Sequence, residues 1–349
     1  MVAHDHSWVG LGRAALVAWL VWWQWSQFTW AGAAVDLQRD PITRLLVLSA
    51  IPATLVMVVA IPHAFGSSGR WFGVAYLAVQ LLVLAMQGSE ALRHAQFRGS
   101  FVRYASLAAI APVAVIIGGF LDGEARVGAW IIAAVLDVLG GLLGARGEWR
   151  INAVHFAERH ALFVIIALGE VLVGAGLTAS KLGLDGHVVL GLAVATSGAC
   201  VIWWTYFAFI PHVAEHALRH HAGPRGVLAR DLFTFGHFPI VAGLIAYAVA
   251  VEHVVHHPTA TLPATERALL ACAIGLLMAA YLHIQLRLRR GFALERGVLV
   301  VVVATWCALT RTVPAWIVVG VVIGLLGLTQ AITWRRFRQG ALRAISPNR

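Results

Sequence analysis

Long apolar stretches, separated by short loops that contain glycine, proline or charged residues, run along almost the whole chain. Because about 20 apolar residues cross the hydrocarbon core of a bilayer, windows of this length predict eleven helices. We expect an all-α, polytopic transmembrane helical bundle forming a single membrane domain over residues 1–349. The predicted helices cover residues 11–34, 42–63, 71–90, 102–120, 127–145, 159–180, 187–210, 231–253, 264–286, 293–310 and 313–333.

Composition supports the membrane assignment and excludes other classes. The chain is 60% hydrophobic and 12% charged, with a mean hydropathy of +0.80, a balance that soluble globular domains do not show. A net charge of +10 would suit nucleic acid, but the basic residues are dispersed between apolar segments, so we expect no nucleic-acid partner. The three cysteines lie inside apolar segments, which predicts neither a disulfide nor a metal site, and no cofactor is expected.

The distribution of basic residues predicts the topology. Of the 26 lysines and arginines, twenty fall in the loops that follow odd-numbered predicted helices and in the C-terminal tail. Cytoplasmic loops of membrane proteins carry the excess of basic residues, and here the sign alternates consistently through all eleven helices. We therefore expect the N-terminus outside and the C-terminus in the cytoplasm.

A parallel duplication is suggested by two similar apolar segments. Residues 127–142 and 313–328 share an Ala-Trp-Ile core and a later Leu-x-Gly-Leu, and they lie six predicted helices apart. An even number of helices gives both copies the same orientation, as a repeat about an axis along the membrane normal requires. The expected half-repeats are residues 1–145 and 159–333.

The sequence from His155 to Leu177 carries the most informative polar residue. Glu170 interrupts an apolar run about ten residues, or roughly 15 Å of helix, from its charged start, which places it near the middle of a bilayer. An ionisable group at this depth is costly and favours a functional role. The alternative is a protonated glutamate that hydrogen-bonds a neighbouring helix and fixes its packing.

Asp137 lies at much the same depth on the preceding predicted helix. If the two carboxyl groups faced each other, one would hold a proton, which would suit a proton or cation relay. The alternative is that Asp137 and Glu170 point to different partners. At the charged start of the Glu170 helix, His155, Glu158 and Arg159 are expected to shape a cytoplasmic entrance or, alternatively, to anchor the helix at the interface.

Tryptophans form two groups within predicted helices. The run Trp22–Gln27, which includes Trp23, mixes indoles with amides. It begins about three turns into its predicted helix, which is too deep in the bilayer for the outer interfacial belt. Trp203 and Trp204 invite the same two interpretations. Each group either packs within the helices or in a belt, or lines a polar cavity where ring faces contact a cation.

Histidines suggest two further sites. His212, Glu215 and His216 fit the H-x-x-E-H spacing of a zinc protease, but no third ligand is indicated and a solvated basic loop explains the pattern better. His237 is expected in a turn near the cytoplasmic mouth of a helix, where an imidazole would pass or sense protons unless its role is structural.

Several motifs resemble the bacterial low temperature requirement A family of integral membrane proteins. They occur in the family's order and span most of the chain. The matching segments are WWQWSQFTW (residues 22–30), RDPITRLL (39–46), AIP-x-AF (60–65), HFAERHALFVIIALGE (155–170), WWTYF (203–207) and DLFTFGHFPIVAG (231–243).

The resemblance implies a membrane fold in the bacterial inner membrane, but it implies no mechanism. The family's first helix, with an acidic, Phe-rich motif, has no counterpart here, which indicates either a start codon assigned too late or a natural truncation.

Two functional hypotheses follow. The first is a secondary transporter or ion-conducting protein that uses Glu170, with protons, small cations or small solutes as partners besides the lipid bilayer. The second is a non-transporting structural or regulatory protein, or a lipid-modifying enzyme, that supports growth at low temperature. We find no nucleophile or metal constellation at a membrane surface, so no enzymatic activity is expected. The sequence leaves the oligomeric state open.

Overall fold

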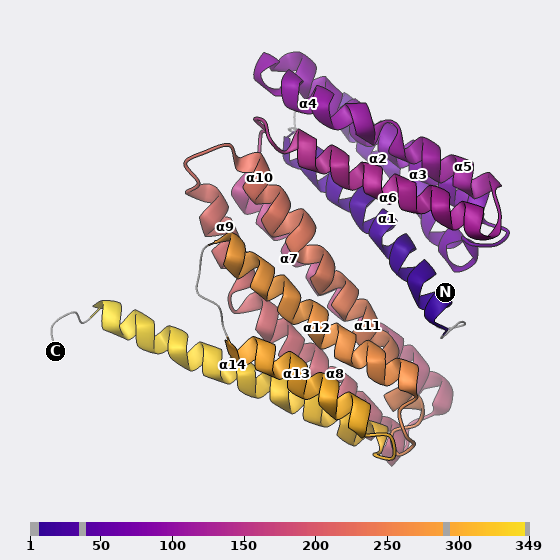
Figure 1. Ribbon diagram of the computed structural model, residues 1–349, viewed down its shortest axis with the longest axis vertical. Coiled ribbons are helices and arrows are strands. Elements are labelled where there is room, and N and C mark those ends of the chain that lie inside the picture. Colours follow the sequence, from indigo (N-terminus) through magenta and orange to yellow (C-terminus); the bar gives the residue numbers. More distant parts are fainter. Residues whose placement is uncertain (1–6, 35–39, 289–293, 346–349) are drawn as a thin grey trace. The chain divides into compact units, whose positions relative to one another are not determined.

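The computed structural model describes residues 7–34, 40–288 and 294–345, and this part of the chain is built from helices (Figure 1). The expected all-α membrane architecture is confirmed. Within the described residues, nine helical segments are long and apolar enough to cross a membrane. The loop residues 35–39 and 289–293, which contribute to the predicted charge asymmetry, lie outside the described residues.

Each of the eleven predicted segments coincides with a helix. Two of these helices, α1 (Trp8–Ala34) and α13 (Leu294–Leu309), are not among the nine apolar spans. The α1 helix carries the run of indoles and amides, and α13 has 16 residues.

By packing, the chain divides into two compact units. The first contains Met1–His160 and Ala214–Phe238, and the second contains Ala161–Val213 and Pro239–Arg349. Helix α7 (Ala153–Leu182) contributes residues to both units. The predicted duplication remains a prediction.

In the first unit, α3 packs against α1, α2, α4 and α5, and α6 packs against α1, α4 and α5. Its core holds large side chains such as Phe72, Tyr76 and Trp130, none of them exposed. The elements are α1, α2 (Pro41–Ala60), η1 (Ile61–His63), α3 (Gly69–Arg93), α4 (Ala95–Ala108), α5 (Ala111–Phe120), α6 (Gly123–Gly144), α10 (Arg225–Ala229) and the π-helix η2 (Arg230–Phe235), with the start of α7.

Prolines and glycines explain the breaks and close contacts in this unit. Helix α2 ends just before Pro62, and α5 begins just before Pro112, because proline lacks an amide hydrogen and clashes with the preceding turn. Gly73 of α3 lets the backbone of α5 approach closely. A Cβ atom at Gly73 would lie 2.9 Å from Ile116 Cα and 3.0 Å from Val115 O.

The buried side chain of Arg126 hydrogen-bonds two chain segments of the same unit, one after η1 and one at the end of α5. Its guanidinium, near the start of α6, donates to the carbonyl oxygens of Gly118, Leu121, Ala64 and Gly66 at 2.8 to 3.1 Å. The side chain is 4% exposed. The carbonyls of Gly118 and Gly66 also accept from the backbone amides of Leu121 and Gly69. One buried arginine thus supplies donors to carbonyls of two chain segments, at the ends of η1 and α5.

The second unit consists of the remainder of α7 with α8, α11, α12, α13 and α14. Helix α8 packs on α14, and α12, α13 and α14 pack in sequence. Gly191 lies against the backbone at Val254, and Tyr247 donates to the carbonyl of Ala195 at 3.0 Å. The elements are α8 (Gly186–Phe207), α9 (Ile210–Arg219, shared with the first unit), α11 (Gly236–His256), α12 (Ala264–Arg287), α13 and α14 (Ala315–Ile345).

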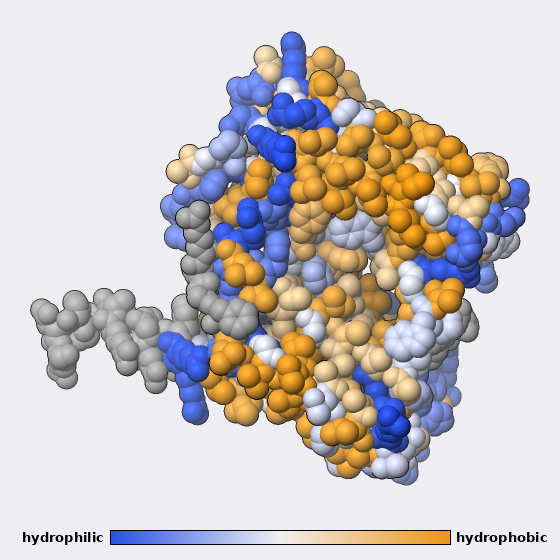
Figure 2. Space-filling view, viewed as in Figure 1, coloured by the Kyte–Doolittle hydropathy of each residue, from blue (hydrophilic) through white to orange (hydrophobic). Residues whose placement is uncertain are grey.

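Apolar side chains cover much of the exposed surface (Figure 2). Exposed leucines, isoleucines and valines line α2, α5, α6 and α7. In a water-soluble protein such faces would be unfavourable, whereas in a bilayer they meet lipid chains. The surface therefore agrees with an assignment as a multi-pass membrane protein.

Candidate functional site

Thr234 of the π-helix η2 is hydrogen-bonded to three side chains of helix α1. The Trp22 indole donates to the Thr234 carbonyl at 3.0 Å, and the Trp30 indole donates to the Thr234 hydroxyl at 3.0 Å. The hydroxyl groups of Ser26 and Thr234 are 2.9 Å apart. Trp22, Ser26 and Trp30 recur every four residues, so they lie on one face of α1. A π-turn carries one extra residue in the helix and often marks a functional site.

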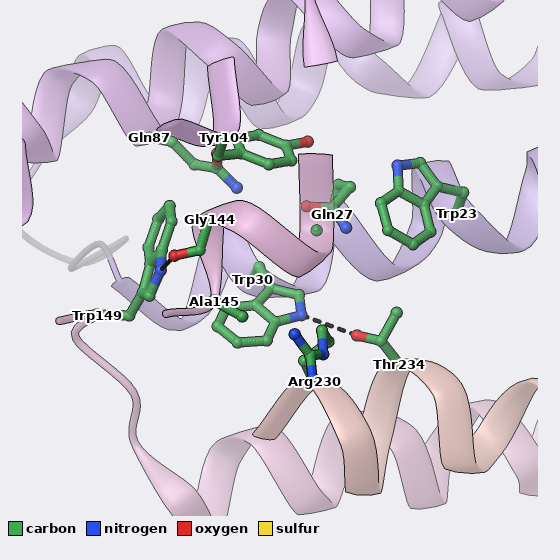
Figure 3. Close-up of a pocket in the computed structure, with 11 residues that line it drawn as sticks. Trp23, Gln27, Trp30, Gln87, Tyr104, Gly144, Ala145, Trp149, Arg230 and Thr234 are labelled. Atoms are coloured by element: carbon green, nitrogen blue, oxygen red, sulfur yellow. Dashed lines mark hydrogen bonds between the residues drawn. The ribbon is translucent and has the colours of Figure 1, made fainter. Parts of the chain in front are cut away.

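Beside this junction, the first unit contains a small pocket with a cavity volume of about 20 Å³ (Figure 3). Gln87 and Tyr104 form one side, Trp30, Arg230 and Thr234 form the other, and Trp149 and Trp23 close the two ends. Further lining comes from Gln27, Gly141, Gly144 and Ala145.

Polar groups in this pocket are incompletely satisfied. Trp23 Nε1 and Gln87 Oε1 are buried, and neither has a hydrogen-bond partner among the described residues. Arg230 pairs with the adjacent Asp231 through a 2.7 Å hydrogen bond, so the pocket has little net charge. Glycines keep the space open, because a Cβ at Gly141 would lie 2.6 Å from the Trp23 ring. A cavity of this size, lined by unsatisfied polar groups, suits one water molecule.

A second polar group, deeper in the same unit, surrounds Asp137. The Tyr76 hydroxyl donates to Asp137 Oδ2 at 2.7 Å, while Asp137 Oδ1 is buried without a partner among the described residues. Gln24 donates to Gln80 at 3.0 Å, and Gln80 donates to the hydroxyl of Tyr104 at 3.1 Å. Since Tyr104 also lines the pocket, this chain of amides and hydroxyls leads from the pocket into the unit.

His237 belongs to a buried aromatic cluster rather than to the predicted turn. It is the second residue of α11, 1% exposed, with Nδ1 at 3.0 Å from the Leu232 carbonyl oxygen. Its ring lies 5.0 Å from that of His160, whose Nδ1 is 2.8 Å from the Phe156 carbonyl oxygen. These contacts place a proton on Nδ1 of both rings and a lone pair on Nε2. His160 Nε2 is buried without a partner in the described part of the chain.

The predicted entrance residues lie at the start of α7. His155 Nδ1 and Glu158 Oε2 are 3.3 Å apart, and both side chains are largely exposed. Arg159 is partly buried and crosses α1 at Gly32, where a Cβ would lie 3.3 Å from its guanidinium. The pair is therefore accessible, whereas the arginine is packed on a helix.

The remaining predicted residues belong to the second unit. Glu170 is exposed, and the structure gives it no ion pair or hydrogen bond within the described residues. Trp203 and Trp204 are 49% and 37% exposed, and the Trp203 ring stacks on Phe207 at 5.2 Å. In contrast, Trp23 is fully buried. The two tryptophan groups of the sequence therefore have different environments.

Sequence analysis missed most of the polar chain. Gln80 of this chain and Gln87 of the pocket both lie on α3, seven residues apart, so they share a face. Amides at this spacing in an apolar helix are the signal that would have identified it. Across the residues that the structure describes, no group of three or more histidine, cysteine, aspartate or glutamate side chains is arranged to hold a metal ion.

Comparison with known proteins assigns the family. The family described as "Bacterial low temperature requirement A protein (LtrA)" matches residues 1–331. An uncharacterized protein of Rhizobium meliloti (strain 1021) is 34% identical over 259 residues, which cover 70% of this chain. The matched region spans 62% of the length of that relative. No solved structure matches the chain. With nearly its whole length matched, the chain belongs to the bacterial low temperature requirement A family of multi-pass membrane proteins.

Proposed function

We propose that this protein is a secondary transporter or ion-conducting protein of the bacterial inner membrane, with Asp137 and Glu170 as its protonatable or cation-binding groups. The observation that carries the proposal is the environment of Asp137. It is 1% exposed within a candidate span, and one of its two carboxyl oxygens has no partner in the described structure. A carboxyl group that served packing would have both oxygens satisfied.

The polar chain of the first unit supports a route for water, a proton or a small solute. It joins Gln24, Gln80 and Tyr104 by hydrogen bonds and ends at the aromatic pocket. Buried Gln24 Oε1 and Asp137 Oδ1 both have room for an additional donor, since neither has one among the described residues. Water bound at these oxygens would extend the chain towards the carboxyl group.

Glu170 enters the proposal from the second unit. An exposed carboxylate on an apolar span is costly in contact with lipid, which favours a surface that meets water or a polar partner. Arg159, Glu158 and His155 would form the charged entrance of α7, on the cytoplasmic side according to the distribution of basic residues. His237, Trp23, Trp203 and Trp204 would contact the translocated species. The proposal assigns no catalytic residue.

Flux measurements in proteoliposomes test the proposal. The full chain is reconstituted with a pH-sensitive dye inside, and a membrane potential is imposed with a potassium gradient. We expect proton flux that falls at least tenfold in Asp137→Asn and in Glu170→Gln. Glu124→Gln is the matched control, because its carboxylate is 87% exposed near the start of α6 and should leave flux unchanged.

A correctly folded wild-type protein that carries neither protons nor alkali cations would refute transport. The non-transporting structural, regulatory or lipid-modifying role would then stand. If flux persists in Asp137→Asn but is lost in Glu170→Gln, Asp137 has no part in transport and Glu170 remains the protonatable group.

A further inference from the structure

We infer that the second unit binds an anionic phospholipid in a pocket at one end of helices α12, α13 and α14. The pocket is a groove open on one side, with a cavity volume of about 150 Å³. This inference is independent of transport. The lining residues are Phe209, Ile210, Val213, Tyr281, Ile284, Gln285, Leu288, Arg296 and Thr333.

Arg296 supplies the charge for the headgroup. Its guanidinium lies over the Tyr281 ring, 4.5 Å from the centroid, and its Nη1 is buried without a hydrogen-bond partner in the described structure. The neighbouring Glu295 pairs with Arg336 at 2.9 Å and does not hydrogen-bond Arg296 Nη1 in the described structure. A buried cationic donor without an acceptor is unfavourable, and a phosphate oxygen would satisfy it with a charge-assisted hydrogen bond.

The other walls of the pocket fit an acyl chain. One wall is formed by Phe209, Ile210 and Val213, at and just before the start of α9. The other is formed by Ile284 and Leu288, at the end of α12. Apart from Arg296, the lining has no charged side chain. A small soluble anion would leave this apolar surface exposed to water, whereas a lipid buries it.

The position along the helices also favours a lipid. The pocket lies where α12 ends at Arg287 and α13 begins at Leu294, next to Trp334 and Arg335 of α14. Tryptophan and arginine gather at the level of the lipid headgroups, and basic pockets between spanning helices bind acidic headgroups. A phosphate on Arg296 would therefore be at headgroup depth, with its chain directed along the apolar lining.

The test uses the purified full chain in detergent, titrated with phosphatidylglycerol or with phosphatidylcholine of identical acyl chains. Native mass spectrometry counts the bound lipids. We expect one tightly bound phosphatidylglycerol, with a preference over phosphatidylcholine of about tenfold, the ratio that one ionic hydrogen bond supplies. Arg296→Gln should abolish the preference, and Arg296→Lys should retain part of it. Arg311→Gln, which changes an exposed arginine between α13 and α14, should keep it.

Three outcomes would overturn the inference. The first is equal binding of the two lipids by the wild-type protein, and the second is an unchanged preference in a folded Arg296→Gln variant. The third is displacement of phosphatidylglycerol by equimolar inorganic phosphate, which would indicate a site for a soluble anion. Val213→Trp gives a separate check of the apolar wall, because filling the pocket should remove the tightly bound lipid without altering any charge.

Discussion

The indole of Trp22 donates a 3.0 Å hydrogen bond to the main-chain carbonyl of Thr234, 212 positions further along the sequence. Both groups are buried, and the hydroxyl of Thr234 binds two more side chains of α1, those of Ser26 and Trp30. Thr234 is thus hydrogen-bonded to side chains from three successive turns of α1. This junction positions Arg230 at the aromatic pocket.

Loss of the Thr234 hydroxyl should weaken the first unit measurably. Thr234→Val removes the bonds to Ser26 and Trp30, so we expect a loss of about 2 kcal/mol, at about 1 kcal/mol for each bond. Unfolding of the purified protein in detergent measures the loss. Thr329→Val is the control, because that hydroxyl binds only the Leu325 carbonyl of its own helix. Equal stabilities of the two variants would contradict the role of Thr234.

Replacement of Arg126 should be among the most destabilising changes. Arg126→Gln removes four hydrogen bonds to carbonyl oxygens, including those of Ala64 and Leu121, at a cost of about 3 kcal/mol or more. The melting temperature of the variant should fall well below that of Arg70→Gln, whose side chain is exposed. A melting temperature equal to that of the Arg70 variant would show that water replaces the guanidinium.

Close packing of α3 on α5 predicts a position-specific glycine effect. Gly73→Ala places a Cβ against the backbone of Ile116, which cannot move away as a side chain would, so we expect a loss of about 1–3 kcal/mol. Gly128→Ala meets no atom within 4 Å and should leave stability unchanged or slightly higher. Thermal unfolding of the two variants distinguishes packing from a general intolerance of glycine replacement.

The start of α2 should respond to pH. Asp40 accepts from Arg93 at 2.7 Å and from Thr43 at 2.8 Å, and these hydrogen bonds lower the pKa of the Asp40 carboxyl group. A lowered pKa in the folded state adds stability above the unfolded pKa of about 4, and this stability is lost as pH falls through the folded value. The protection factors of amides at the start of α2, which divide out the intrinsic pH dependence of hydrogen exchange, should therefore fall upon acidification below about pH 4.

Asp40→Asn is the informative variant for this site. Asparagine can still accept from the amide of Ile42 as an N-cap, but it removes the charge that pairs with Arg93. We expect lower protection factors at the start of α2 at neutral pH, with no further fall on acidification. An unchanged acid response in the variant would assign the effect to another group.

Local sequence patterns predicted the helices, whereas the polar contacts depend on tertiary structure. Apolar length is a local signal, so the spans could be predicted from the chain. The predicted segments 42–63 and 102–120 ran through Pro62 and Pro112, near which the structure breaks the α-helices. Arg126 falls in a loop between two predicted helices. Its burial depends on carbonyl groups of residues about 60 positions away, which no local pattern reveals. His160 lay within a recognised motif, but no spacing rule connects it with His237, 77 positions away, and the contact follows from the packing of α7.

The π-helix also predicts how this region tolerates a change in length. One turn of Arg230–Phe235 holds one residue more than an α-helix needs. Removing one residue there would restore regular geometry, but it would rotate everything downstream by about 100° relative to Thr234. His237 would then lose its ring contact with His160 of α7. Deletions in this segment should therefore be rarer among functional homologues than deletions in the nearby 220–224 loop.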